Sequence, residues 1–281
     1  MRSVGVARPV LKWAGGKSRL IDEICMHFPQ KIDTYYEPFV GGAAVFFALA
    51  KQKRFNRAVL ADRNPELINV YTALKSNVDD VIKALRRWKY DRDTYYRVRD
   101  NFKRNPTPAE RAARTIYLNK TGYNGLYRVN HSGLFNVPFG RYTNPTICDD
   151  ANLRLVAECL NSVTLIEADF AETCSKARAG DAVYFDPPYL PVSETANFTS
   201  YDRHPFGIEE HQRLAKEFSK LAKRKVTAVL SNSDTPETQS LFEQWSVERL
   251  QVARAINSLA SKRGPVSELL VVNRKPNGTR T

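Results

Sequence analysis

The stretch YYEPFVGG, residues 35–42, begins as a strand and ends in a glycine turn. Tyr35–Val40 is a short aromatic and β-branched run, typical of a buried strand. A helical pattern follows at Ala44–Lys51, and a second strand is expected at Arg57–Ala61. Strands that alternate with helices in this way predict an α/β fold. Glycines at the first strand-to-helix turn also let the backbone approach a ligand closely.

The same alternation continues along the rest of the chain. Apolar runs bounded by turn residues predict three more parallel strands, at Val163–Ala168, Ala182–Phe185 and Val226–Ser231. Helices are expected at Pro65–Lys75 and Glu209–Lys223. Two late runs, Val247–Val252 and Glu268–Asn273, predict a hairpin around Gly264-Pro265. The expected fold is α/β, with a doubly wound and mostly parallel sheet.

Residues 78–148 break this alternation. Their pattern is helical over Thr94–Lys103 and Pro108–Asn119, and it then becomes rich in glycine, asparagine and proline. We therefore expect a discontinuous α/β domain over residues 9–77 and 149–275, with a mainly helical inserted domain over residues 78–148. The insert is expected at the carboxyl edge of the sheet, where open α/β folds bind ligands.

Positive charge is concentrated in the insert. The chain has 43 Lys and Arg against 30 Asp and Glu, a net charge of +13. Between Leu85 and Arg128 basic residues outnumber acidic ones about three to one, and aromatic residues are interleaved with them. Basic groups neutralise phosphates and aromatic rings stack on bases, so nucleic acid is the expected partner. A solvated helical face is the alternative explanation.

Composition also excludes several classes of protein. No apolar run is long enough to cross a bilayer, and the N-terminus lacks the pattern of a secretory signal. Four scattered cysteines lack metal-ligand spacing and indicate reduced thiols. We therefore expect a cytoplasmic protein with no membrane partner and no metal. A monomer is the starting hypothesis, on which the sequence itself is silent.

Asp186-Pro187-Pro188-Tyr189 directly follows the apolar run Ala182–Phe185. Proline fixes φ, so the carbonyl of Pro187 is predicted to point into a pocket beside the carboxylate. Both groups are acceptors, which suits a substrate that presents an NH2 group, and Tyr189 can stack on the ring that carries it. An adenine turned out of its duplex is such a substrate. The alternative is a structural turn after a strand.

Two further segments suggest ligand contacts. Asp62 ends the second strand, where an acid is well placed to bind ribose hydroxyls. Its alternative role is to cap the helix that begins near Pro65. The early segment KWAGGK, residues 12–17, lacks the spacing of a phosphate-binding loop. A turn that lays Trp13 and Lys17 against a ligand is the other possibility.

Taken together, KWAGGK, EPFVGG, an LAD ending at Asp62 and DPPY resemble the Dam family of adenine-N6 DNA methyltransferases, from about Pro9 to Lys275. The resemblance implies a Rossmann-like class I methyltransferase fold in the α arrangement, S-adenosylmethionine as cofactor and double-stranded DNA as partner. It implies catalytic roles for Asp186, Pro187, Pro188 and Tyr189. The cofactor-binding residues that it implies are Trp13, Lys17, Pro38, Phe39, Gly41, Asp62, Asp169, Phe170 and Asp186. One departure is Ala43, where many relatives have glycine; we expect it to cost little unless its φ is positive.

Residues 120–128 and 135–142 resemble the target-recognition hairpin of Dam enzymes that read GATC. Asn124-Gly125 is typical of a tight turn. Arg128 has a fork that suits a guanine edge, and Leu126 suits apolar contact with a base. Tyr123 and Asn124 would wedge into the base stack, although Tyr123 could instead belong to the hairpin core. Arg141 could contact phosphate alone. The full set of candidate DNA-binding residues is Lys12, Arg99, Lys120, Tyr123, Asn124, Leu126, Arg128, Pro138 and Arg141.

The resulting hypothesis is a site-specific DNA methyltransferase that methylates N6 of adenine in GATC. Asp186 and the Pro187 carbonyl would accept the N6 protons of a flipped adenine during direct in-line transfer, with no cysteine nucleophile. The loop Ser193–Thr199 is expected to order beside the active site when DNA binds. Restriction–modification, DNA replication and repair are compatible roles. The alternatives are an amino-methyltransferase acting on RNA, on a protein amide or on cytosine N4, or a catalytically silent DNA-binding module.

Overall fold

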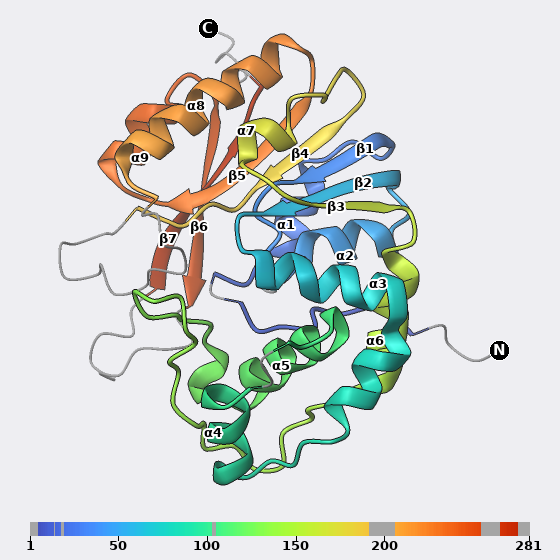
Figure 1. Cartoon of the computed structure of the whole chain (residues 1–281). Helices are drawn as coiled ribbons and strands as arrows, with labels where there is room; N and C mark the ends of the chain where they lie inside the picture. The colour runs from blue at the N-terminus through green and yellow to red at the C-terminus, as the bar shows by residue number, and fades with distance from the viewer. Residues whose placement is uncertain are drawn as a thin grey trace, which may run out of the picture.

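The computed structural model describes residues 5–13, 15–17, 20–102, 105–190, 206–253 and 265–274. Its centre is a seven-stranded sheet (Figure 1). The strands are β1 Ile32–Glu37, β2 Phe55–Asp62, β3 Val163–Glu167, β4 Ala182–Phe185, β5 Thr227–Ser233, β6 Ser246–Ala253 and β7 Pro265–Val272. The helices are α1 Ile21–Met26, α2 Ala44–Lys51, α3 Pro65–Leu85, α4 Arg92–Asp100, α5 Pro108–Thr121, the 3-10 turn η1 Tyr123–Gly125, α6 Asp150–Cys159, α7 Phe170–Thr173, α8 Ile208–Lys223 and α9 Pro236–Phe242.

The strand order is β3-β2-β1-β4-β5-β7-β6. Strands β1 to β5 are mutually parallel, and β7 is antiparallel to both β5 and β6. The predicted doubly wound, mostly parallel α/β sheet is therefore confirmed. The chain builds outward from β1 to β3 and then returns to place β4 on the other side of β1. The carboxyl ends of β1 and β4 thus meet at a topological switch point, where open α/β sheets bind ligands.

Both faces of the central strands are buried, as the continuous apolar runs predicted. In β4, Tyr184 packs into a cluster with α2 and α3, whereas Val183 and Phe185 pack into a second cluster with α8 and α9. Strand β1 divides in the same way between Tyr35 and Tyr36. Because successive side chains point to opposite faces, each strand joins the two cores. Figure 1 shows the helices on the two sides of the sheet.

Some predicted bounds were wrong. Strand β1 ends at Glu37 and not at Val40, because Pro38 has no N–H to continue the ladder. Helix α4 starts at Arg92, where the Asp91 side chain accepts the N–H of Thr94, and it ends before the predicted Lys103. Pro265 lies within β7 rather than in a turn, and its predicted turn partner Gly264 lies outside the described residues.

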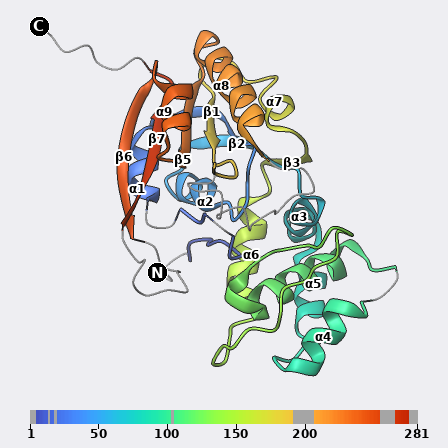
Figure 2. The same ribbon diagram turned by 90° about the vertical axis from the view of Figure 1, so that its left-hand side faces the viewer.

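Helices α4 and α5 form a lobe beside the sheet (Figure 2), and α5 packs along α3. Helix α3 contains a non-helical residue, Asn77, with φ −159° and ψ 77°. The proposed division between residues 77 and 78 falls at this break, and it stays a prediction. Tyr95 and Tyr117 of the basic stretch are fully buried in the lobe. Part of the aromatic pattern that suggested base stacking is therefore hydrophobic core.

The segment after α5 returns along itself through two isolated bridges, Gly122 with Phe139 and Val129 with Phe135. Asn124 and Gly125 both have positive φ, and the N–H of Leu126 donates to the Tyr123 carbonyl. The predicted tight turn is therefore confirmed. It ends helix α5, however, and the chain reverses at residues 130–134, where the N–H of Asn130 bonds the Leu134 carbonyl.

All four cysteines are free thiols. No helix in the described part of the chain has both the length and the apolar character that crossing a membrane requires.

Candidate active site

Asp186 lies immediately after β4, at the switch point of the sheet. Its Oδ1 atom is 2.8 Å from Lys17 Nζ, and the side chains are 21% and 4% exposed respectively. Burial raises the pKa of Asp186, and the Lys17 ammonium opposes that rise. The ion pair therefore favours the ionised form of a carboxylate that its surroundings would otherwise protonate.

Lys17 reaches this position through the turn in the KWAGGK segment. Gly15 has a φ of +73°, and the N–H of Gly16 donates to the Trp13 carbonyl at 3.2 Å. Lys17 Nζ also donates to the Gly15 carbonyl. The same ammonium lies 4.8 Å from the centre of the Tyr189 ring. The turn thus places Lys17 in contact with both Asp186 and Tyr189 of the DPPY motif.

Tyr189 is anchored at its far end. Its hydroxyl donates to Glu268 Oε2 at 3.0 Å. Burial, followed by the nearby carboxylates of Asp186 and Glu268, raises the pKa of Tyr189. The phenol therefore keeps its proton and acts as a donor. No role for Glu268 was predicted, because nothing in the local pattern of β7 distinguishes it from other acidic residues.

Glu37, at the end of β1, is a second buried acid near Asp186. It is 2% exposed and accepts a hydrogen bond from the Tyr35 hydroxyl at 2.8 Å. Burial raises the pKa of Glu37 to about 8, with a smaller upward contribution from Asp186. Glu37 is therefore largely neutral at neutral pH, whereas the Lys17 ammonium favours the charged form of Asp186.

The glycine turn after β1 packs closely against Trp13. Gly41 has a φ of +45°, and a Cβ atom there would lie 2.8 Å from Trp13 Cδ1. The Tyr71 hydroxyl donates to the Gly41 carbonyl at 2.8 Å. Ala43 has a φ of 57°, in the left-handed region, so the stated exception applies and alanine carries a cost there. A side chain in that region costs about 1–2 kcal/mol.

Asp62 ends β2 beside this turn. Its carboxylate accepts the N–H of Gly41 at 3.3 Å and that of Asn64 at 3.0 Å. The cap of helix α3 is Asn64, whose side chain accepts from two N–H groups of the first turn. The alternative role of Asp62 as the helix cap is therefore wrong. Asp62 instead ties the end of β2 to the glycine turn that follows β1.

Asp169 lies on the rim beyond Asp62, where it caps helix α7 and pairs with both Arg63 and Arg213. Phe170, 1% exposed, packs on Phe39 with ring centres 5.7 Å apart. The Arg213 guanidinium lies 4.3 Å from the Phe170 ring. Neither of these arginines was predicted from the sequence. They hold Asp169 at the same edge of the sheet as the glycine turn.

The candidate DNA-binding residues are spread over the insert and the N-terminal segment. Tyr123 is 51% exposed, so its alternative placement in a hairpin core is wrong. Arg128 is exposed, and its guanidinium bonds the Asn136 side chain at 2.7 Å. Lys12 lies against Gly125 and over the Tyr142 ring at 4.9 Å. Among the other candidate DNA-binding residues, Asn124, Pro138 and Arg141 are exposed, whereas Lys120 and Leu126 are half-buried.

Arg99 is used within the lobe. Its guanidinium pairs with Asp100, donates to the Val137 carbonyl at 3.1 Å and lies 4.6 Å from the Tyr96 ring. These contacts brace the returning segment against α4. The predicted loop Ser193–Thr199 lies outside the described residues.

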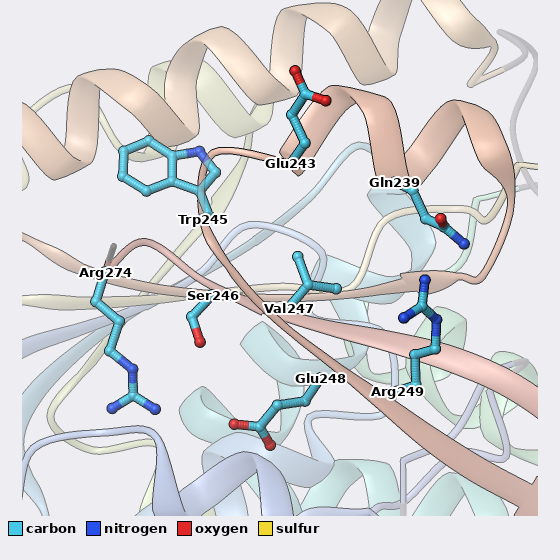
Figure 3. Close-up of a pocket in the computed structure, with 8 residues that line it drawn as sticks. All are labelled: Gln239, Glu243, Trp245, Ser246, Val247, Glu248, Arg249 and Arg274. Atoms are coloured by element: carbon cyan, nitrogen blue, oxygen red, sulfur yellow. The ribbon is translucent and has the colours of Figure 1, made fainter. Parts of the chain in front are cut away.

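A groove of about 540 Å³ lies elsewhere, along the outer edge strand β6 (Figure 3). Trp245, Val247 and Arg249 line it together with residues of α9. None of its lining residues belongs to the site described above.

Comparison with known proteins decides the family. A family model described as "D12 class N6 adenine-specific DNA methyltransferase" matches residues 13–256. The chain belongs to this family. This protein is 39% identical over 274 residues to the type II methyltransferase M1.LlaDCHI of Lactococcus lactis subsp. cremoris, and the match covers 95% of each chain.

Two other relatives match this protein over similar lengths. It is 39% identical over 285 residues to the type II methyltransferase M.MjaIII of Methanocaldococcus jannaschii, covering 95% of this chain and 99% of that one. It is 38% identical to a DNA adenine methylase of Escherichia coli, covering 94% and 95%. The predicted adenine-specific DNA methyltransferase is thereby confirmed, and so is the resemblance from which it was inferred.

Proposed function

We propose that this enzyme transfers the methyl group of S-adenosylmethionine to N6 of an adenine in GATC, after that adenine has turned out of the duplex. The observation that carries the proposal is the group at the end of β4. The Asp186 carboxylate lies 2.8 Å from Lys17 Nζ, and the same ammonium lies over the Tyr189 ring. A carboxylate beside an aromatic ring suits a flat base that carries an amino group.

The residues around the switch point fit S-adenosylmethionine. Asp62 offers a carboxylate for ribose hydroxyls, and Trp13 packs so closely on Gly41 that a Cβ there would lie 2.8 Å from Trp13 Cδ1. Asp169 and Phe170 offer an acceptor and an aromatic face along the same edge. Trp13, Lys17, Pro38 and Phe39 complete the proposed cofactor site. S-adenosylmethionine supplies an electrophilic methyl group when bound.

The chain's own groups prepare the nucleophile. The N6 lone pair of adenine is delocalised into the ring, so the amino group is a poor nucleophile. Asp186 and the Pro187 carbonyl accept its two protons as hydrogen bonds, which favours a tetrahedral nitrogen with a localised lone pair. Tyr189 holds the ring by stacking, and Pro188 keeps the motif rigid. Fixing the reacting groups in line can remove roughly 7–11 kcal/mol of the barrier.

The insert supplies the recognition of DNA in this proposal. Tyr123 and Asn124 are exposed at the turn after α5, and Arg128 is exposed on the segment that follows. An arginine fork matches a guanine edge, and an exposed aromatic can replace a base in the stack. The resemblance of this segment to the Dam recognition hairpin favours GATC. We also propose that the enzyme acts as a monomer and without a metal.

Methylation of an unmethylated plasmid tests the proposal. Purified protein and S-adenosylmethionine are incubated with the plasmid, which is then cut with enzymes that distinguish methylated from unmethylated GATC. Asp186→Ala is the matched variant, and we expect protection by the wild type alone. Methyl label in adenine without protection would refute GATC and keep the reaction. Label that enters only RNA or a protein amide would refute the proposed substrate.

A further inference from the structure

One rung of the β5–β7 ladder makes two contacts with the chain just after DPPY. In this rung Ser233 pairs with Glu268. Glu268 Oε2 accepts a hydrogen bond from the Tyr189 hydroxyl at 3.0 Å, and Ser233 Oγ donates to the Leu190 carbonyl at 3.0 Å. Two consecutive residues, Tyr189 and Leu190, are therefore held by two residues that face each other across a single pair of strands.

The geometry restrains the ring from both sides. Lys17 Nζ lies 4.8 Å from the centre of the Tyr189 ring, while Glu268 holds the hydroxyl at its end. The backbone after the ring is fixed by Ser233, which is itself 4% exposed. A ring with a free hydroxyl could rotate and tilt about its side-chain torsions. The hydrogen bond at the Tyr189 hydroxyl and the one at the Leu190 carbonyl together hold the ring in one orientation.

We infer that Glu268 and Ser233 are positioning residues, which set the orientation of Tyr189 in which it stacks on the target adenine. The inference rests on the proposed function, since it assumes that Tyr189 receives the base. On this inference, strand β7 contributes to the reaction by carrying Glu268. β7 pairs antiparallel with β5, and this places Glu268 opposite Ser233 and within reach of the Tyr189 hydroxyl.

Four variants separate this role from simple stabilisation. Glu268→Ala removes the acceptor, whereas Glu268→Gln keeps a carbonyl oxygen that can accept the same bond. Tyr189→Phe keeps the ring and removes the donor. Glu248→Ala is the matched control, because Glu248 is an acid on the neighbouring strand β6 that pairs with His27 at 3.3 Å, away from the site.

We expect Glu268→Ala to lower kcat for methylation of a GATC duplex about tenfold, the effect of losing one charge-assisted hydrogen bond. The Kd for S-adenosylmethionine should stay at the wild-type value. Glu268→Gln should keep most of kcat, and the double variant Glu268→Ala with Tyr189→Phe should be no slower than the slower single variant. Multiplying losses in the double variant, or an unchanged kcat in Glu268→Ala, would overturn the inference.

A second measurement needs no substrate. Protein labelled with 3-fluorotyrosine gives a fluorine NMR resonance for Tyr189, assigned by its loss in Tyr189→Phe. We expect Glu268→Ala to shift or broaden this resonance and Glu248→Ala to leave it unchanged. An unchanged resonance in Glu268→Ala would overturn the inference whatever the activity. A changed resonance, together with a wild type that methylates no DNA, would instead refute the proposed function and keep the positioning of Tyr189.

Discussion

Replacing Lys17 with methionine removes the ammonium 2.8 Å from Asp186 Oδ1 and keeps much of the side-chain volume. Burial raises the pKa of Asp186, and Lys17 provides the largest opposing effect. In the variant, Asp186 therefore holds its proton to higher pH. Because the ionised carboxylate is the proposed acceptor for N6, we expect the acid limb of the kcat profile to move to higher pH.

The size of this effect follows from the distance between the charges. Two unit charges 2.8 Å apart attract by about 6 kcal/mol at an effective dielectric constant of about 20. Water that enters the vacated space offsets part of this loss. If water replaces three quarters of the attraction, the net loss is about 1.5 kcal/mol and the acid limb moves by about one pH unit. If water replaces only half of the attraction, the acid limb moves by about two pH units.

The assay is kcat across a pH series, with saturating S-adenosylmethionine and a saturating GATC duplex. The control is Lys75→Met, because Lys75 Nζ donates to the Val163 carbonyl at 2.6 Å, away from Asp186. The control should keep the wild-type profile. A Lys17→Met profile that has a lower plateau but an acid limb at the wild-type pH would refute the reasoning. Lys17 would then act on binding or orientation rather than on the charge of Asp186.

Variants at three other positions test separate features. Burial raises the pKa of Glu37 from 4.5 to about 8, so folding favours its protonated form and the wild type should lose stability as pH rises through this window. Glu37→Gln should flatten that loss in urea unfolding series, and parallel curves would contradict the assignment. Ala43→Val should lower the free energy of unfolding by more than about 2 kcal/mol, because a branched side chain is strained at positive φ and this site is buried. Ala43→Gly should raise it by up to about 1 kcal/mol, because the relief of strain is partly offset by the greater freedom of glycine in the unfolded chain. Arg128→Ala should reduce discrimination at the contacted guanine by about 1–3 kcal/mol, measured as the kcat/KM ratio between GATC and a substituted duplex; equal losses on both duplexes would indicate a phosphate contact.

Features encoded by short runs of residues were predictable. The apolar runs around Ala182–Phe185 and Arg57–Ala61 located parallel strands, because a strand buried on both faces needs a continuous apolar run. Asn124-Gly125 located a tight turn, because these residues tolerate positive φ. The DPPY motif indicated the candidate site, because it follows a central strand. In each case the deciding interactions lie within a few residues of one another.

Features that depend on distant residues were not predictable in the same way. Lys17 and Asp186 meet across the sheet, and Glu268 reaches Tyr189 only because β7 pairs antiparallel with β5. Tyr95 and Tyr117 belong to the aromatic and basic stretch that suggested base stacking, yet their rings fill the core of the lobe.

A sequence pattern therefore specified the elements and the acidic motif of this methyltransferase, because periodicity and turn preference are local properties. The partners of Asp186 and Tyr189, and the positive φ of Ala43, followed from the folded arrangement. Strand order, strand direction and the packing of each face decide which side chains meet, and these depend on interactions along the whole chain.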